Sequence, residues 1–402
     1  MKRRVFLSTA GMGSAAAMLA APALAQGKPS ISWRLTSSYP KSLETLWGIS
    51  EQVARRVSEM TDGGFQIQPF AAGEIVPGLQ AIDAVSDGTV ECAHSLGSFK
   101  IGTDPTWAFD TSLPFGLNTR QTIAWLYYGG GRELVNEFVG KSNLRSIPSG
   151  NTGAQMGGWY RKEISSLADL RGLKLRIAGL GGTILQRLGV VPQQIAGGDI
   201  YPALERGTID AAEFSGPFDD EKLGFQKVAQ HYYYPGWWEG TANVGLYVNL
   251  DKWKALPAHY QAALEAACAE AMTHCVAKYD NGNPDALMRL MAQGARVHAF
   301  PDDVLAAAFA ESRKLYDEYA ASNESFRKIY ENWSAYWLKQ QQWLRVAELP
   351  YDFVTSAQAA ALAQASAAQP PAEAPAAPGA PAAPAAPDAA AAPAAPGAPA
   401  SN

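Results

Sequence analysis

The sequence predicts an α/β protein of two lobes joined by a hinge, with two parallel or mixed sheets flanked by helices and extra helices towards the C-terminus. Three observations predict this fold. A helix-glycine-strand pattern occurs twice, short strands alternate with amphipathic helices, and residues 257–344 are rich in strong helix formers.

The repeated pattern is the basis for expecting two lobes. Residues 84–97 return as residues 203–216, and each copy is typical of a last helical turn, a glycine stop and a short strand, here expected at 90–92 and 209–211. Ligands of open α/β sheets bind beyond the carboxyl ends of the strands. We therefore expect the residues that close the two copies to face each other across a cleft for a small solute. These residues are His94-Ser95 and Glu213-Phe214.

The order of elements divides the chain into segments. In the first lobe, strands at 31–35, 65–67 and 90–92 alternate with helices at 43–60 and 79–87, which predicts a parallel sheet. A second series begins near Leu144, and a strand at 244–249 is expected to return to the first lobe. The predicted boundaries are 28–150 for the first lobe with a returning segment at about 240–275, 151–239 for the second lobe, and 276–358 for C-terminal helices. Within the second series we expect strands at 145–147 and 173–177, a flexible glycine-rich segment at 178–182, and a helix at 183–188.

The two ends of the chain have distinctive compositions. Residues 1–25 combine paired arginines, an apolar stretch and a small-residue cleavage site, which predicts a twin-arginine signal peptide and a periplasmic location. Residues 359–402 are dominated by alanine and proline, which predicts a disordered spacer. The net charge of -5 makes nucleic acid an unexpected partner. Cys268 and Cys275 share one predicted helix about 10 Å apart, too far for a disulfide.

Three charged side chains are candidates for binding. Arg176 ends a strand, and its guanidinium either binds a carboxylate through two parallel hydrogen bonds or is simply solvated. Glu213 and Glu239 lie in apolar, aromatic surroundings, and they are either unrelated glutamates or two acids of one cleft. If both faced a cleft that also receives an anion, a bound hard cation would be the simplest way to offset their repulsion.

Other motifs have less specific interpretations. Residues 93–97 resemble the nucleophile elbow of α/β-hydrolases, so a secreted serine hydrolase that uses Ser95 with His298 is an alternative of a different class. The aromatic run 232–238 predicts either core or a pocket wall. The histidines have no zinc-ligand spacing with one another or with the cysteines.

Three segments together, 165–179, 200–213 and 256–264, resemble the solute receptors of tripartite ATP-independent periplasmic (TRAP) transporters. The resemblance covers about residues 31–353. It implies a type II-like periplasmic binding-protein fold, no enzymatic activity, and delivery of a carboxylate ligand to a membrane permease. The C-terminal helices are expected to pack on the lobes or to pair two subunits as a homodimer.

Within that family, residues 151–155, 213–220 and 237–239 are similar to the branch that binds α-keto acids such as pyruvate. This similarity implies that Arg176 clamps the substrate carboxylate and that a metal cation, sodium with calcium as the alternative, joins substrate and protein. The branch usually has tryptophan where this chain has Phe214, which leaves hydroxy acids, dicarboxylates and aromatic acids as alternative ligands. The residues implied to contact the substrate are Arg176, Gln155, Phe214, Ser98 and Phe99. Those implied to bind the cation are Gln155, Glu213, Glu239 and the main-chain oxygen of Phe214.

Overall fold

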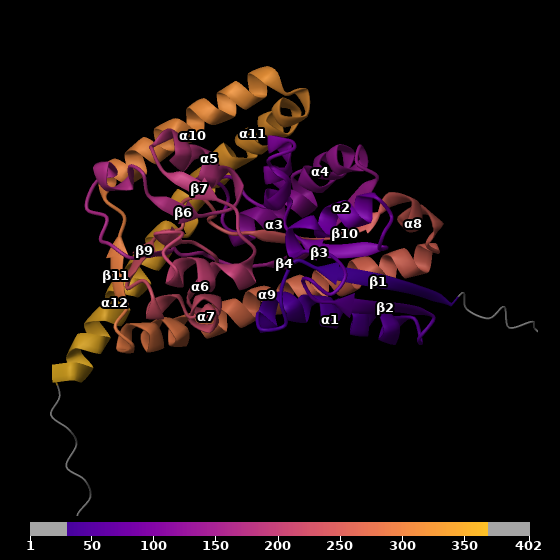
Figure 1. The fold of residues 1–402 in the computed structure, drawn as a ribbon, viewed down its shortest axis with the longest axis horizontal. Coiled ribbons are helices and arrows are strands. Elements are labelled where there is room, and N and C mark those ends of the chain that lie inside the picture. Colours follow the sequence, from indigo (N-terminus) through magenta and orange to yellow (C-terminus); the bar gives the residue numbers. More distant parts are fainter. Residues whose placement is uncertain (1–29, 369–402) are drawn as a thin grey trace, which may run out of the picture. The chain divides into compact units, whose positions relative to one another are not determined.

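The computed structural model describes residues 30–368, which fall into two units divided after Gln341. The first unit contains two separate sheets, each with its own helices, and these define a first and a second lobe (Figure 1). The predicted signal peptide at 1–25 lies outside the described residues and stays a prediction. Within residues 30–368, no helix combines the length and apolarity that crossing a membrane requires.

The first sheet contains five strands in the order β2-β1-β3-β10-β4. Strand β1 pairs in parallel with β2 and β3, as the sequence predicted, while β10 is antiparallel to both β3 and β4. The predicted return of the chain is therefore confirmed. Strand β4 pairs with β10 from Leu144 to Asn151, which agrees with the predicted boundary of the first lobe at residue 150 and shows that placing this strand in the second series is wrong. The strands are β1 (Ile31–Ser37), β2 (Phe65–Phe70), β3 (Cys92–Ser95), β4 (Leu144–Asn151) and β10 (Asn243–Asn249).

The second sheet contains six strands in the order β11-β9-β5-β8-β6-β7. Its edge strand β11 was not predicted, because residues 257–344 were expected to be entirely helical. Gly294, with a φ of +99°, ends the preceding helix, and the following residues pair in parallel with the tyrosines of β9. The strands are β5 (Trp159–Tyr160), β6 (Lys174–Arg176), β7 (Val191–Gln193), β8 (Ala211–Ala212), β9 (His231–Tyr234) and β11 (Arg296–Ala299).

Helices cover both sheets. The first lobe contains α1 (Glu44–Met60), α2 (Ala81–Ser86), α3 (Thr119–Tyr128), α4 (Gly131–Gly140) and α8 (Leu250–Ala255). The second contains α5 (Gly179–Arg187), α6 (Gly197–Glu205) and α7 (Pro217–Leu223), and the later helices are α9 (Ala258–Ala292), α10 (Asp302–Ser322), α11 (Glu324–Ala347) and α12 (Leu349–Ala368). Short 3₁₀ turns are η1 (Gly78–Gln80), η2 (Gly97–Lys100), η3 (Pro105–Asp110), η4 (Leu167–Leu170) and η5 (Phe225–Lys227).

The apolar face predicted for the first helix is the face that α1 buries. Leu46, Ile49, Val53 and Val57 are all at most 3% exposed, at the spacing of one helical face. Met60, the fifth residue predicted for this face, is 40% exposed at the end of the helix, so the prediction is wrong there. Helix α1 packs against β2 and against the long helix α9, which also contacts β4 and, in the second lobe, α7 (Figure 1). Helix α9 therefore ties the two lobes together.

The repeated pattern forms the same local structure in both lobes. Gly88 follows α2 and Gly207 follows α6, and both have a positive φ, +77° and +72°, that favours glycine. The strands that follow, β3 and β8, begin two residues later than predicted. The glycine-rich segment expected to be flexible instead forms the first turn of α5, which begins at Gly179.

The second unit, as far as it is described, consists of the end of α11 and helix α12. Helix α12 continues to Ala368, so residues 359–368 are helical and the predicted start of the disordered tail at 359 is wrong. The reason is composition, since alanine is the strongest helix former and the first proline of the tail is Pro370. Residues 369–402 lie outside the described part of the chain.

Candidate functional site

A small enclosed pocket, the inner pocket, has walls from both lobes and a volume of about 30 Å³. Four first-lobe residues contribute, and the second lobe provides the ends of β6 and β8 with the residues after them. The segments that connect the lobes complete the walls. The lining residues are Tyr39, Leu46, Leu96, Phe99, Thr152, Gln155, Arg176, Ala178, Glu213, Phe214, Ser215, Glu239 and Ala242.

Arg176 is held at this pocket by its neighbours. It is the last residue of β6, which pairs in parallel with β8, and the register places Arg176 beside Ala212. Glu213 follows directly, and its nitrogen donates to the main-chain oxygen of Arg176 at 3.0 Å. The guanidinium Nη1 donates to the main-chain oxygen of Glu213 and, at 3.1 Å, to its carboxylate, while Nε donates to the oxygen of Ile195 at 3.0 Å. Arg176 is 2% exposed, which excludes the solvated alternative. The described residues leave Nη2 without an acceptor.

Glu213 and Glu239 line the same pocket, and both side chains are buried. Burial raises the pKa of Glu213 above its usual range, although the charge of Arg176 opposes this rise. Burial also raises the pKa of Glu239, and the negative charge of Glu213 adds to the effect. The two carboxylates therefore repel each other in a space with one neutralising arginine.

The oxygen atoms around these acids suit a hard cation. The side-chain oxygen Oε1 of Gln155 is buried without a hydrogen-bond partner, while its Nε2 donates to Thr152 Oγ1 at 3.0 Å. Carboxylate, amide and main-chain oxygens are the ligands that sodium and calcium prefer. Residues 30–368 contain no cluster of three or more His, Cys, Asp or Glu side chains arranged for a metal. A cation here would therefore depend on amide and main-chain oxygens as well as on the two acids.

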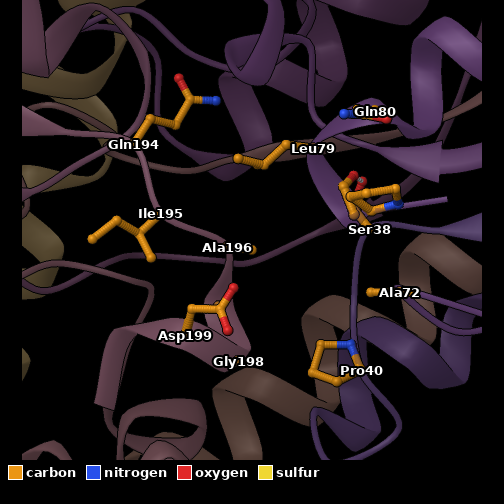
Figure 2. Close-up of a pocket in the computed structure, with 14 residues that line it drawn as sticks. Ser38, Pro40, Ala72, Leu79, Gln80, Gln194, Ile195, Ala196, Gly198 and Asp199 are labelled. Carbon is orange, nitrogen blue, oxygen red and sulfur yellow. Dashed lines mark hydrogen bonds between the residues drawn. The ribbon is translucent and has the colours of Figure 1, made fainter. Parts of the chain in front are cut away.

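A second and larger cavity, the outer cavity, has a volume of about 620 Å³ and is also lined from both lobes. Figure 2 shows Ser38, Leu79 and Gln80 on one side, with Gln194 and Ile195 on the other. The complete lining is Ser38, Pro40, Ala72, Gly73, Pro77, Gly78, Leu79, Gln80, Gln194, Ile195, Ala196, Gly197, Gly198 and Asp199.

The outer cavity adjoins the inner pocket at Phe214. A side-chain carbon added at Gly197, in the outer cavity, would come within 2.9 Å of the Phe214 ring. The Arg176 guanidinium lies over that ring, with 5.4 Å between its central carbon and the ring centre. Arg176 also donates a hydrogen bond to the main-chain oxygen of Ile195, which lines the outer cavity. Phe214 and Arg176 therefore form a wall between the two spaces.

Most of the predicted site residues meet in the inner pocket, but some do not. Arg176, Gln155, Glu213, Phe214, Glu239 and Phe99 line it. Ser98 does not, although it lies close by: a carbon added at Gly179 would contact both the Ser98 side chain, at 3.4 Å, and Glu239 Oε1, at 3.3 Å.

The expectation that His94-Ser95 would face the cleft is wrong. Both side chains are 1% exposed and neither lines either cavity. Ser95 Oγ accepts a hydrogen bond from Ser38 Oγ at 2.7 Å, and His94 packs edge-on against Tyr39. Strand β3 extends to Ser95, so the residue that reaches the pocket from this copy of the repeat is Leu96.

The remaining motifs have structural explanations. In the aromatic run, Tyr232, Tyr233, Trp237 and Trp238 are at most 4% exposed and form core, which is the first of the two interpretations, while Tyr234 is 45% exposed. Cys92, Cys268 and Cys275 are free and buried, which agrees with the absence of a bridge predicted between the last two.

The alternative pair of Ser95 and His298 also has a structural explanation. His298 belongs to the edge strand β11 of the second sheet, and its Nε2 lies 3.1 Å from Nδ1 of His231. Ser95 belongs to the first sheet. Each side chain has its own polar neighbour.

Three polar residues of the pocket were missed, Tyr39, Thr152 and Ser215. Tyr39 lies two residues beyond the end of β1, and Thr152 directly follows β4. The rule that ligands bind beyond the carboxyl ends of strands could have found Tyr39, because β1 is the central parallel neighbour of β2 and β3.

Comparison with known proteins assigns the chain to a family. Residues 37–323 match the bacterial extracellular solute-binding proteins of family 7, DctP. The chain belongs to the DctP family. A monocarboxylate 2-oxoacid-binding periplasmic protein from a Nostoc species is 48% identical over 365 residues, which cover 89% of this chain and all of the relative.

Solved structures of family members agree with this fold. A TRAP transporter solute-binding protein from Bordetella bronchiseptica, with calcium and picolinate in one active site of a mixed-occupancy dimer, is 51% identical with a TM-score of 0.82. The match covers 84% of this chain and 99% of the Bordetella protein. A TRAP periplasmic solute-binding protein from Pseudoalteromonas atlantica, with bound sodium and pyruvate, is 34% identical with a TM-score of 0.78. The match covers 80% of this chain and 98% of that protein.

Proposed function

We propose that this protein is the periplasmic receptor of a TRAP transporter, that it binds a small 2-oxo monocarboxylate such as pyruvate together with a hard cation, and that it delivers this ligand to a membrane permease. One observation carries the proposal: Arg176, Glu213, Glu239 and Gln155 converge on one enclosed pocket. The relatives with pyruvate and sodium, or picolinate and calcium, support the same ligand chemistry.

Charge balance explains why an anion and a cation would bind together. The inner pocket holds one arginine and two buried glutamates, so an organic anion alone would add a third negative charge. A bound cation supplies the compensating charge to the glutamates and to the oxygens of the ligand. Arg176, the two glutamates and a monocarboxylate ligand together have a charge of −2, which calcium would neutralise completely. Sodium, the ion expected from the sequence, would leave one negative charge or require one protonated glutamate.

The outer cavity supports a monocarboxylate over a dicarboxylate. Its lining contains no lysine, arginine or histidine and includes the acidic Asp199. A second carboxylate that extended past Phe214 would therefore find no cation among these residues. Chain extensions of a ligand in this direction would have to be uncharged.

A melting-temperature panel tests the proposal. Protein freed of ligand and metal is heated with pyruvate, lactate, succinate or picolinate, each in sodium, calcium or potassium chloride. Pyruvate at a hundred times its dissociation constant, with sodium or calcium, should stabilise the fold by about 2.7 kcal/mol, which for a folded chain of this length raises the melting temperature by roughly 3 to 5 °C. The control is each acid without the cation. A larger shift with lactate, succinate or picolinate would favour an alternative ligand, and no shift with any acid would contradict the proposal.

We propose that the chain is a binding protein without catalytic activity. Its family membership supports this, and so do the positions of Ser95 and His298, which belong to different sheets. A periplasmic location is part of the proposal and is supported by the Nostoc relative. Export by the twin-arginine route stays a prediction.

We also propose that α11 and α12 pair two copies of the chain. From Leu338 to Leu362 these helices carry a series of large apolar side chains that are more than half exposed. They are Leu338, Trp343, Val346, Leu349, Tyr351, Phe353, Val354 and Leu362. The dimer of the Bordetella relative supports the pairing.

Light scattering after size exclusion tests the dimer. The unchanged chain should have the mass of a dimer, and a chain with Trp343→Glu and Phe353→Glu that of a monomer, because both changes place charge in the paired face. The double change Tyr128→Glu and Met288→Glu, at exposed apolar residues on other helices, is the control. A monomeric unchanged chain would contradict the pairing.

A further inference from the structure

The hydroxyl of Tyr39 is a buried polar group of the inner pocket that the proposed contacts do not use. Tyr39 is 3% exposed, it lines the pocket, and its hydroxyl oxygen has no hydrogen-bond partner among the described residues. Buried hydroxyls are rarely left unpaired, because their interaction with water is lost without replacement. An unpaired hydroxyl at a ligand site therefore indicates a missing partner.

The position of Tyr39 is fixed by its surroundings. Its main-chain nitrogen donates to Ser37 Oγ at 3.1 Å, and its main-chain oxygen accepts from the nitrogen of Ala72 at 3.1 Å. The ring packs against the edge of His94, with 5.8 Å between ring centres. The side chain is thus held in place before any ligand arrives, so little entropy is lost when its hydroxyl forms a hydrogen bond.

Tyr39 is also the one first-lobe residue lining the inner pocket that has a polar side-chain atom. The other three, Leu46, Leu96 and Phe99, are apolar. Arg176 and Glu213, in contrast, belong to the second lobe. Ser98 of the first lobe also has an unpaired hydroxyl, but it does not line the inner pocket, so among the residues that line it Tyr39 is the one that can give the ligand a side-chain hydrogen bond from the first lobe.

The electrostatic environment keeps this hydroxyl a donor. Burial raises the pKa of Tyr39 above its usual value, the negative charge of Glu239 adds to the rise, and Arg176 opposes it. That the charges of Glu239 and Arg176 both act on Tyr39 agrees with its place at the same pocket. A neutral tyrosine can donate one hydrogen bond to an anionic oxygen.

We propose that the Tyr39 hydroxyl donates a hydrogen bond to an oxygen of the bound 2-oxo acid and so links the ligand to the first lobe when the cleft is closed. This inference rests on the proposed function. The ligand then contacts Arg176 from one lobe and Tyr39 from the other. Because this bond exists only in the ligand-bound, closed form, it would favour closure over the open form.

The variant Tyr39→Phe tests this by removing a single oxygen. The dissociation constant of pyruvate, measured by calorimetry at saturating calcium, should rise about tenfold, which corresponds to about 1.4 kcal/mol. Calcium binding without pyruvate should not change. The melting temperature without ligand should stay equal or rise, since an unpaired buried hydroxyl has been removed.

Tyr316→Phe is the matched control. The hydroxyl of Tyr316 donates to the oxygen of Pro114 at 2.8 Å and lines neither cavity, so this change should lower the melting temperature and leave the pyruvate affinity unchanged. Unchanged pyruvate affinity in Tyr39→Phe would overturn the inference while leaving the proposed function intact. If the unchanged protein binds none of the acids of the panel, the proposed function fails and the inference fails with it.

Discussion

Replacing Arg176 by lysine should weaken pyruvate binding by about 10- to 150-fold, because the variant loses charge-assisted hydrogen bonds worth about 1.5 to 3 kcal/mol. Lysine keeps the positive charge beside Glu213 but cannot reproduce the fork that bonds Glu213, Ile195 and a ligand at once. Calorimetry with pyruvate at saturating calcium measures the change. The melting temperature without ligand shows whether the fold is intact.

Two further variants make this result interpretable. Arg187→Lys changes an arginine of α5 that pairs with Glu318 on the surface, and its pyruvate affinity should equal that of the unchanged protein. Arg176→Gln removes the charge altogether, and because Glu213 can then take up a proton, the fold should survive while pyruvate binding is lost. Affinities within threefold of the unchanged protein in both Arg176 variants would contradict its role as the carboxylate clamp.

Replacing Glu239 by glutamine should have opposite effects on stability and on cation binding. The variant loses one of two buried like charges, so its melting temperature without cation should rise. Calcium affinity should fall at least tenfold, since a carboxylate is replaced by a neutral amide in a site that depends on charge. Calorimetry with calcium, and thermal unfolding with and without calcium, measure the two effects.

A surface glutamate is the control for this experiment. Glu318→Gln removes an exposed carboxylate that pairs with Arg187, so it should leave calcium affinity unchanged and alter the melting temperature little. A Glu239→Gln variant that bound calcium normally would exclude this residue as a cation ligand. A lower melting temperature without cation would instead indicate that Glu239 stabilises the empty pocket.

The sequence predicted the charged part of the site because its members follow recognisable signals. Arg176 ends a strand before glycines, and Glu213 closes a repeat whose first copy has the same helix-glycine-strand order. The resemblance to a transporter receptor family added Gln155 and Phe214. All four line the inner pocket.

The same repeat led to one wrong expectation. Its first copy ends in His94-Ser95, which matches Glu213-Phe214 in position, but β3 extends through Ser95 and buries both side chains. In the second copy β8 ends at Ala212, which leaves Glu213 free to enter the pocket. The length of each strand, set by pairing with its neighbours, decided which side chains became available.

The sequence by itself determined the local elements, the two-lobe plan and the charged residues of the pocket, because periodic apolar positions, glycine stops and charged strand ends act over a few residues. Tertiary structure alone decided the antiparallel pairing of β4 with β10, the pairing of β11 with β9, and the place of Tyr39 in the pocket. All three features depend on contacts between segments that are far apart in the sequence. The local pattern of one segment does not specify which distant strand it pairs with or in which register.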